Sequence, residues 1–463
     1  MTHLLLRNVE VSGVRRDVAI ADGRISHIAD RLDPHDHEVI DGHGGALLPG
    51  LHDHHIHLHA TAAAMASVRC GPPAVTSPDA LAAVLRNAPG DSWIRGVGYV
   101  ETVASLLDSV ALDRFEATRP VRIQHRSGAV WFLNSAAAAA VGLEQADHPG
   151  VERDDHGHPT GRVWRADSWL RDRLPDNGPP PLDAVAAELT RYGITGVTDA
   201  TPDLDARTQS AIIEAHETGI LPQRVHLLGV PIGQETTGPT VTTGPYKIVI
   251  ADSALPELDS LTQTIRHAHD HGRPVAVHCV SRVALVLLLA AFDDAGTVTG
   301  DRIEHGAVIP DELISELADR QLTIVTQPGF IADRGDDYLD RVDAEDLPHL
   351  YRCQSLVDRS VPIALSSDAP YGPLDPWAVI AAAITRQSAT GIAIGTNESM
   401  SPPTALNRYL APLDDPGGEP RQVVVGAPAD LVLLGCSLRT ALSSPNARNI
   451  RCTTIRGHVH RLR

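Results

Sequence analysis

Apolar and polar positions alternate in a short-strand pattern at the beginning of the chain. Apolar runs occur in LLLRNVEV (4–11), RRDVAIADGRISHIAD (15–30) and HEVIDGHGGALLPG (37–50), and Asp22-Gly23 is a turn signal inside the second run. Runs of this length, bounded by Gly, Asp and Pro, are typical of β-strands and hairpins. The pattern predicts a small β unit over the first fifty residues.

The pattern changes after residue 53. Strand-like apolar runs now alternate with helical stretches rich in Ala, Leu and Arg, as in GRPVAVHCV, VALVLLLAAFDDAG, DRIEHG, IPDELISELADRQ and LTIVTQPG. Repeated alternation of strands and helices predicts an α/β fold with a parallel sheet or a barrel. After Pro402-Pro403, strand signals return in RQVVVGAPADLVLLG and TTIRGHVHRLR. We expect this tail to complete the sheet that the first residues begin.

These changes give three expected segments: 1–52, 53–396 and 397–463. Two stretches inside the middle segment have loop composition, namely 230–245 (VPIGQETTGPTVTTGP) and 144–181, which ends in Pro179-Pro180-Pro181. Long loops of this kind usually cover or border a functional site.

Composition restricts the class of protein. The 463 residues are 43% hydrophobic and 21% charged, which is typical of a folded globular chain. The formal charge of −19 argues against nucleic acid or an anionic membrane as the main partner. The apolar run at 284–292 is far shorter than the roughly 20 residues that span a bilayer. Since MTHLLLRNVEVSG lacks the apolar core of a signal peptide, we expect a cytoplasmic protein. We also expect a small-molecule substrate. Homo-oligomers are compatible with the sequence.

Cysteine and lysine usage carry different information. The five cysteines are widely spaced and form no C-x-x-C pair, so neither a disulfide framework nor a cysteine-rich zinc site is indicated. Lys247 is the only lysine in the chain. Arginine stays protonated, whereas a lysine amine can react with carbon dioxide to form a carbamate that binds metal. A site that needs an amine would explain this single lysine, although chance retention would also explain it.

Histidines at strand positions suggest a metal site. In PGLHDHHIHLHA, His55 and His57 are two residues apart, so both side chains point to the same face of a strand. His54 would face the other way. Four later residues lie near apolar strand runs: Lys247, His278, His305 and Asp368. The last three follow their runs, at the strand ends where barrel enzymes keep their active sites.

The sequence resembles the amidohydrolase superfamily and, within it, the amidohydrolase 3 family. The resemblance covers nearly the whole chain and rests on these motifs: PGLHDHHIHL, WIRGVGY, WFLNSAA, HPTGRV, YGITGVTDA, YKIVIADS, VAVHCV, RIEHG, LSSDAPYGPLDPW and GAPADLVLL. The resemblance implies a (β/α)₈ TIM barrel with a small β-sandwich built from both terminal segments. It also implies one or two divalent metal ions, most commonly zinc.

By position, the resemblance assigns His55, His57 and Asp368 to one metal ion. His278 and His305 would bind the other ion, and a Lys247 carboxylated by carbon dioxide would bridge the two. Two segments depart from the family pattern. Ala129 stands where a histidine is frequent, and Arg162 and Arg165 follow the segment after which an acidic residue is common.

The implied chemistry is hydrolysis of a C–N bond in an amide, formamide or cyclic amide other than a peptide. A metal-activated hydroxide attacks the carbonyl, and Asp368 acts as general acid and base. Residues in or just after the predicted barrel loops are candidate substrate contacts: His125, Arg126, Trp131, Gln327, Tyr371 and Arg386.

Three alternatives stay open from the sequence. A mononuclear deaminase acting on a heterocycle commonly has a Glu three residues after the fifth-strand histidine, but here Ser281 follows His278 at that distance. An isomerase or decarboxylase on the same scaffold would use the same metal ligands. A barrel that binds metal without catalysis is the remaining alternative, although all six candidate positions keep chemically competent residues. The sequence selects neither the substrate nor the identity of the metal.

Overall fold

The computed structural model describes residues 3–34, 37–175, 178–236 and 238–461. The chain forms two compact units, one built from Met1–Leu58 and Pro181–Arg463 and the other from His59–Pro180. The second unit interrupts the segment 53–396 that the sequence analysis treats as continuous. The boundary near residue 181 coincides with Pro179-Pro180-Pro181, whereas no composition change marks residue 58, where the strand and helix pattern continues.

The first unit begins with a sheet of order β3-β2-β1-β4. Its strands are β1 (Leu4–Val11), β2 (Val14–Ala21), β3 (Arg24–Ala29) and β4 (Glu38–Asp41). β2 and β3 pair in antiparallel fashion across Asp22 and Gly23, whose φ angles are 51° and 72°. A two-residue hairpin turn with two positive φ angles requires such residues, so the predicted hairpin is confirmed.

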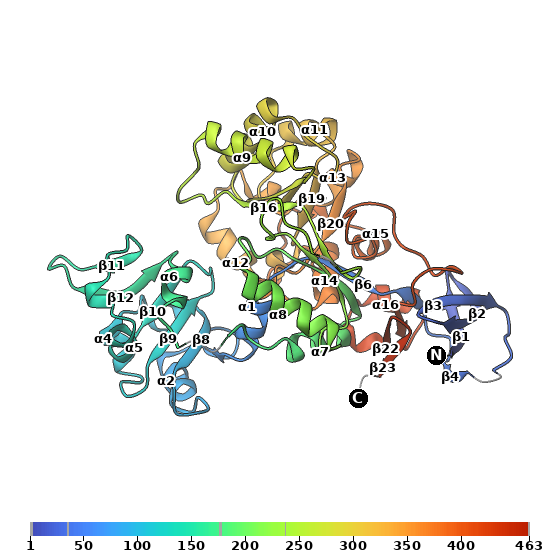
Figure 1. Cartoon of the computed structure of the whole chain (residues 1–463), viewed down its shortest axis with the longest axis horizontal. Helices are drawn as coiled ribbons and strands as arrows, with labels where there is room; N and C mark the ends of the chain where they lie inside the picture. The colour runs from blue at the N-terminus through green and yellow to red at the C-terminus, as the bar shows by residue number, and fades with distance from the viewer. Residues whose placement is uncertain (1–2, 35–36, 176–177, 237, 462–463) are drawn as a thin grey trace. The chain divides into compact units, whose positions relative to one another are not determined.

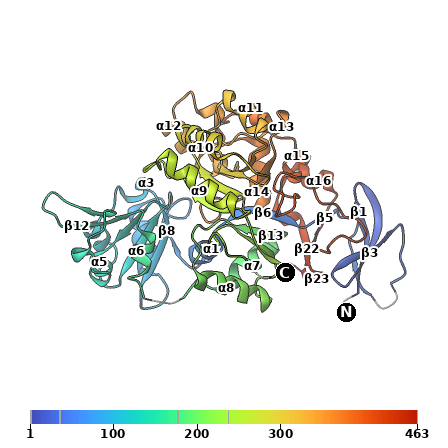
Figure 2. The same cartoon turned by 45° about the horizontal axis from the view of Figure 1, so that its top comes forward.

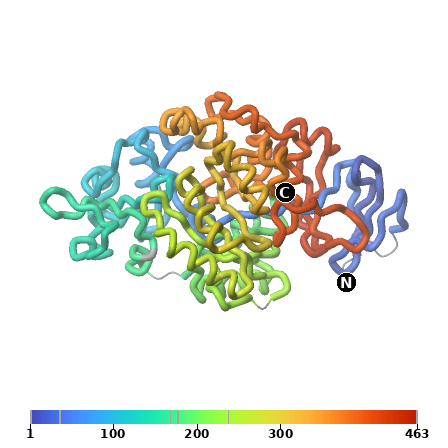
Figure 3. Tube along the Cα trace, turned by 90° about the horizontal axis from the view of Figure 1, so that it is seen from above, coloured from blue at the N-terminus to red at the C-terminus, as the bar shows by residue number. Residues whose placement is uncertain are grey.

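Both ends of the chain contribute to a second terminal sheet, of order β23-β22-β21-β5. Its strands are β5 (Leu47–Pro49), β21 (Leu431–Leu434), β22 (Ile450–Ile455) and β23 (His458–Arg461). Leu4, Leu6, Leu431 and Leu433 belong to one buried cluster, so the two terminal sheets share a hydrophobic core. Figure 3 shows the N-terminal and C-terminal segments side by side. The tail therefore joins the N-terminal strands as expected, although 421–426 is not a strand.

The middle of the first unit contains two parallel sheets, of order β15-β14-β13-β6 and β16-β17-β18-β19-β20. The strands of the first are β6 (Leu51–Ile56), β13 (Ile194–Asp199), β14 (Arg224–Leu227) and β15 (Val241–Thr243). Those of the second are β16 (Tyr246–Val249), β17 (Val275–Cys279), β18 (Arg302–His305), β19 (Thr323–Thr326) and β20 (Ile363–Leu365). β15 lies in the segment 230–245 that the sequence predicts as a loop.

Backbone hydrogen bonds connect the edges of these two sheets. The Asp368 amide donates to the His55 carbonyl at 2.8 Å, and the His57 amide donates to the Ala369 carbonyl at 2.9 Å. At the other edge, the Lys247 amide donates to the Leu228 carbonyl at 3.1 Å. The strand that carries His55 and His57 therefore lies directly beside the segment that carries Asp368.

Helices follow most of these strands and lie along the second sheet in Figure 1. α10 shows why the sequence forms them: Ser281 caps its first turn, and Leu285, Leu288 and Phe292 on one face are buried. The helices of the first unit that lie beyond residue 181 are α7 (Asp183–Arg191), α8 (Ala206–Glu217), α9 (Leu258–Asp270), α10 (Arg282–Ala295), α11 (Asp311–Asp319), α12 (Gly329–Arg341), α13 (Gln354–Asp358), α14 (Pro376–Thr385), α15 (Pro402–Asn407) and α16 (Leu438–Ser443).

The second unit contains a sheet of order β11-β12-β10-β9-β8-β7. Its strands are β7 (Val68–Arg69), β8 (Ile94–Tyr99), β9 (Val121–His125), β10 (Val130–Leu133), β11 (Val151–Arg153) and β12 (Pro159–Trp164). The helices at 58–171 are α1 (Leu58–Met65), α2 (Pro78–Arg86), α3 (Glu101–Ala104), α4 (Ser109–Asp113), α5 (Ser135–Ala140) and α6 (Asp167–Arg171). Because β11, β12 and α6 occupy much of 144–181, the loop predicted there is wrong.

Among the described residues, none of the helices is long and apolar enough to cross a membrane.

The terminal sheets are held together at a glycine. A Cβ atom on Gly45 would lie 1.8 Å from the Leu434 carbonyl oxygen, and this backbone atom cannot rotate away. Gly45→Ala should therefore lower the free energy of unfolding by about 1–3 kcal/mol, measured by urea denaturation. The control is Gly435→Ala, whose Cβ meets only the Asn449 oxygen at 3.7 Å. Equal stability of the two variants would contradict this role of Gly45.

Candidate metal centre

His55 and His57 project from β6 toward a common point. All residues of β6 are buried, because strands lie on both sides of it. The two rings lie with their centroids 5.3 Å apart, as the two-residue spacing predicts. His57 keeps 16% of its side chain exposed, whereas His55 is 1% exposed. His54 is also buried but is not part of the cluster described below.

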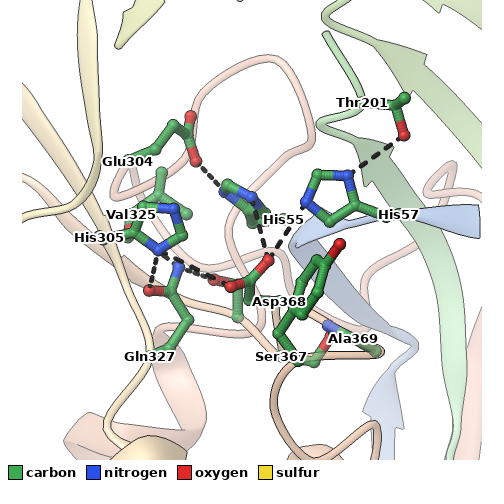
Figure 4. Close-up of polar contacts among 12 residues, drawn as sticks. His55, His57, Thr201, Glu304, His305, Val325, Gln327, Ser367, Asp368 and Ala369 are labelled. Carbon is green, nitrogen blue, oxygen red and sulfur yellow. Dashed lines mark hydrogen bonds and ion pairs between the residues drawn. The ribbon is translucent and has the colours of Figure 1, made fainter. Parts of the chain in front are cut away.

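Asp368 completes a compact group of three potential ligands. It follows β20 with a φ angle of 52°, a conformation that Asp tolerates better than most residues. Its Oδ1 atom lies 3.4 Å from His55 Nε2 and 3.3 Å from His57 Nε2. One ligand atom from each of the three residues lies within 4.8 Å of the others (Figure 4). Two imidazoles and one carboxylate at this spacing suit a divalent cation.

The outer nitrogens of both imidazoles are already used. His55 Nδ1 contacts the Glu304 carboxylate, and His57 Nδ1 forms a hydrogen bond of 3.2 Å with Thr201 Oγ1. The Asp199 carboxylate fixes the Thr201 backbone by accepting its amide at 3.0 Å. The Glu304 carboxylate can only accept, so His55 Nδ1 carries the hydrogen, and the Nε2 atoms of both histidines face Asp368.

Two buried ligand atoms of the His55, His57 and Asp368 cluster have no hydrogen-bond partner among the described residues. Within the described part of the chain, His55 Nε2 and Asp368 Oδ1 are buried and have no hydrogen-bond partner. Burial, together with the nearby Lys247 charge, lowers the pKa of His55 well below its usual value. Since a neutral imidazole is the metal-binding form, the residues present fit a cation at this position.

A second pair of histidines lies beside the first. His305 ends β18 with a φ angle of 72°, and its ring centroid is 4.8 Å from that of His55 and 4.5 Å from that of His278 on β17. His305 Nδ1 donates to Gln327 Oε1 at 2.8 Å, and Gln327 Nε2 donates to Ser366 Oγ at 2.9 Å. This chain of hydrogen bonds orients His305 so that Nε2 stays available for a ligand.

Lys247 lies on β16 and is 4% exposed. Its Nζ atom has no hydrogen-bond partner among the described residues. Burial lowers the pKa of the amine to about 8, although the charges of Glu304 and Asp368 act in the opposite direction. The charge of Lys247 in turn lowers the pKa of His55 and of His305. The structure thus brings the amine into electrostatic range of both histidine pairs.

Glu304 and Arg302 are site residues that sequence reasoning missed. Glu304 is fully buried, and its carboxylate accepts Arg302 Nε at 2.6 Å while it also contacts His55. The sequence analysis did not include Glu304 among the site residues, but the structure shows that it orients the first-strand histidine. The available signal was an acid at a fully buried position of an apolar strand, which requires a partner.

The predicted substrate contacts divide into three groups. Gln327 and Tyr371 belong to the first unit and lie at the cluster: Gln327 contacts His305, and the Tyr371 ring centroid is 5.7 Å from that of His57.

Three others, His125, Arg126 and Trp131, belong to the second unit. His125 contacts Ser127 Oγ at 2.7 Å and Glu101 at 3.3 Å, and the Arg126 amide donates to the Tyr99 carbonyl at 2.9 Å. Trp131 is buried at 4% exposure.

Arg386 is not placed for substrate contact. Its side chain is fully buried, and its guanidinium donates to the carbonyl oxygens of Ile394 at 3.1 Å, Tyr351 at 2.9 Å and Leu350 at 2.6 Å. These bonds occupy all three nitrogens in satisfying a buried backbone, which is a structural role. The sequence prediction failed because the position of Arg386 after an apolar helix does not reveal the direction of its side chain.

Comparisons with known proteins find a matching family model and similar relatives. The model of the amidohydrolase family matches residues 38–460. Amidohydrolase YtcJ of Bacillus subtilis is 27% identical, over 76% of this chain and 75% of the relative. N-substituted formamide deformylase of Arthrobacter pascens is 25% identical, over 90% of this chain and 89% of the relative.

The fold also occurs in solved structures. An uncharacterized metal-dependent hydrolase from Pyrococcus horikoshii OT3 aligns with a TM-score of 0.74 at 18% identity, covering 99% of this chain and all of the other. A metal-dependent hydrolase from Pyrococcus furiosus aligns with a TM-score of 0.70 at 21% identity, covering 93% and 98%. These likenesses indicate a TIM-barrel-like α/β fold.

The contact between Glu304 and His55 predicts an effect on metal binding. Glu304→Gln keeps the shape of the side chain but removes the charge that orients and polarises His55. We expect metal affinity to fall about 10- to 100-fold, measured by titration against a competing chelator. Glu312→Gln on the exposed surface of α11 is the matched control. Unchanged affinity in Glu304→Gln would contradict the orienting role.

Proposed function

Because the chain belongs to the amidohydrolase family, we propose that it cleaves an amide, formamide or cyclic amide of a small molecule, with Asp368 as general acid and base. At the coarser level, the protein is a metal-dependent hydrolase that acts on C–N bonds. The observation that carries the proposal is the convergence of the Nε2 atoms of His55, which is buried, and of His57 on the Asp368 carboxylate. The formamide is included because one relative, over 90% of this chain, is a deformylase of N-substituted formamides.

The residues that would hold metal fall into two sets. His55, His57 and Asp368 would hold one ion, and His278 and His305 would hold a second. A bound divalent cation, most commonly zinc, supplies acidification of a water molecule and polarisation of the substrate carbonyl. The neutral state of His55 and His305, maintained by burial, keeps both imidazoles in the form that binds a cation.

Asp368 is the group positioned to move the proton. Its Oδ1 atom faces the two Nε2 atoms, while its Oδ2 atom lies 3.9 Å from His305 Nδ1. The carboxylate accepts a proton from the attacking water and returns it to the leaving nitrogen. Hydrogen bonds between Asp368 N and His55 O and between Tyr371 N and Asp368 O keep its backbone in place.

Lys247 is the proposed bridge between the two metal positions. Its buried amine is the only lysine amine in the chain and has a lowered pKa, so a neutral fraction is available to attack carbon dioxide. The product is a carbamate, with loss of a proton from the nitrogen. A carbamate at Lys247 would supply two oxygen atoms as potential metal ligands within electrostatic range of His55 and His305.

We also propose a finer description of the scaffold. Eight parallel strands, β6, β13, β14 and β16 to β20, would form a (β/α)₈ barrel joined at the two edges that Asp368 and Lys247 connect. The two terminal sheets with their shared core would form the β-sandwich. A cytoplasmic location and a small-molecule substrate remain part of this proposal on grounds of composition.

The role of Asp368 can be tested directly. Asp368→Asn keeps one oxygen ligand but cannot accept a proton, so kcat should fall by about 10²- to 10⁴-fold while most of the bound metal remains. Turnover is measured on N-substituted formamides, N-acyl amines and cyclic amides, and metal by elemental mass spectrometry. Asp319→Asn on exposed α11 is the control. Near-normal turnover in Asp368→Asn would eliminate the proposed role.

The bridge predicts a metal ratio. Protein prepared without chelators or a histidine tag, and supplied with bicarbonate, should hold about two ions per chain, and Lys247→Ala should hold about one or fewer. Lys247→Met, which keeps the length of the side chain, separates loss of the amine from loss of packing. About one ion in the unmodified chain, unchanged in both variants, would eliminate the bridge and favour a mononuclear deaminase.

A further inference from the structure

A second cavity lies away from the candidate metal centre. It has a volume of about 620 Å³ and is lined by residues at the amino-terminal side of the parallel strands, including His52 of β6 and Arg224 and His226 of β14. Arg224 is the first residue of its strand, whereas the proposed metal ligands His305 and Asp368 lie at or after the ends of theirs. Since strands rise about 3.3 Å per residue, His52 lies about 10 Å along β6 from His55.

The cavity lies between the parallel sheets and the second terminal sheet. Pro49 of β5 and Leu431 of β21 form part of its wall, and so do Thr240 and Leu413. Figure 2 shows β5 and β22 of this terminal sheet beside β6 and β13. The side chains of Val225, Leu413 and Leu431, together with several prolines, give much of the lining an apolar character.

Two histidines in the cavity are neutral hydrogen-bond acceptors. His52 Nδ1 donates to the Ala411 carbonyl at 2.9 Å, so its Nε2 atom carries the lone pair. That Nε2 atom is buried without a partner in the described part of the chain, and the residue is 4% exposed. Burial lowers the pKa of His52 well below its usual value, which keeps the ring neutral.

The His226 ring is held in a similar way, because its Nδ1 atom also contacts a protein oxygen. Its Nδ1 atom lies 2.8 Å from Thr242 Oγ1, and this hydroxyl is within 3.4 Å of the Val225 carbonyl; in the tautomer that donates from Nδ1, Nε2 is the acceptor. Burial lowers the pKa of His226 to about 3. Two glycines make room for these rings: a Cβ on Gly196 would come within 2.7 Å of His52, and one on Gly244 within 2.6 Å of His226.

The arginines leave positive charge facing the cavity. Arg224 uses only Nε, which donates to Asp430 at 2.9 Å, and its two terminal nitrogens have no partner among residues 3–34, 37–175, 178–236 and 238–461. The other oxygen of Asp430 accepts the Arg456 amide at 2.7 Å.

Arg421 donates to the carbonyls of Leu410 and Gly50 and forms no ion pair with a described residue. Burial lowers its pKa to about 10, since nearby carboxylates do not fully compensate the charge. Asp414, the other acid of the lining, is exposed and solvated.

We propose that this cavity is a second binding site for a small carboxylate with an apolar body and a hydroxyl or N–H group. The carboxylate pairs with the free end of Arg224 near Arg421, and the donor group bonds to the Nε2 lone pair of His52 or His226. The apolar wall contacts the body of the ligand. The site is separate from the proposed hydrolysis and does not depend on it.

The probe for this site is 4-hydroxyphenylacetate, which carries one carboxylate, one phenol and an apolar ring. Two matched compounds each lack one group: tyrosol has no charge, and phenylacetate has no hydroxyl. Calorimetry on the full metal-loaded chain should give a Kd below about 1 mM for 4-hydroxyphenylacetate. Both matched compounds should bind at least about tenfold more weakly, because each loses one buried polar contact.

Variants locate the binding. Arg224→Gln removes the positive charge, and Leu413→Trp fills the cavity. Each variant should weaken binding at least about tenfold. Arg359→Gln, at an exposed arginine after α13, should bind as the unmodified chain does. Leu413→Trp decides the question if circular dichroism shows that Arg224→Gln does not fold.

Three results would overturn the proposal. The first is no binding of 4-hydroxyphenylacetate up to about 10 mM. The second is equal binding of tyrosol, which would show that charge is not recognised. The third is loss of binding after metal removal with dipicolinate, which would place the compound at the metal centre. Unchanged affinity in the metal-free protein supports the second site, whatever substrate the hydrolase acts on.

Discussion

The pairing of β6 with the segment after β20 is the constraint on which the site depends. Two backbone hydrogen bonds, from Asp368 to His55 and from His57 to Ala369, bring together residues of β6 and of the segment after β20, which are far apart in the sequence. A one-residue slip would move His55 and His57 to the other face of β6. The register of one edge therefore determines whether two imidazoles and a carboxylate meet.

Burial then gives each of these groups a defined chemical state. Glu304 contacts both Arg302 and His55, so one carboxylate stabilises a buried cation and orients an imidazole. Lys247 lies at the other edge, with an amine that burial makes easier to deprotonate. A buried charge without such partners would cost several kcal/mol, so the polar groups inside these strands depend on one another.

The sequence predicted those features of the site that depend on strand periodicity and on where the strands end. The spacing of His55 and His57 places them on one face, and the apolar runs before His305 and Asp368 place these residues at strand ends, as the structure has them. Strand periodicity does not predict which residue of another strand or loop a side chain contacts. Glu304, on β18, contacts His55 on β6. The Arg386 side chain points toward backbone carbonyl groups. The separate unit at 59–180 has the same alternation of strands and helices as the rest, so its first boundary has no signal in the sequence, and the proline triplet at its second boundary was interpreted as part of a loop.

The location of the single lysine has a practical consequence. Since Lys247 is buried in β16, the folded chain offers no lysine amine to solvent, and its other basic side chains are guanidinium and imidazole groups. Aldehyde fixatives, acylating dyes and amine-coupled sensor surfaces will therefore find no lysine to react with on the native protein. A lysine introduced at a chosen exposed position would be the only lysine side chain accessible to such reagents.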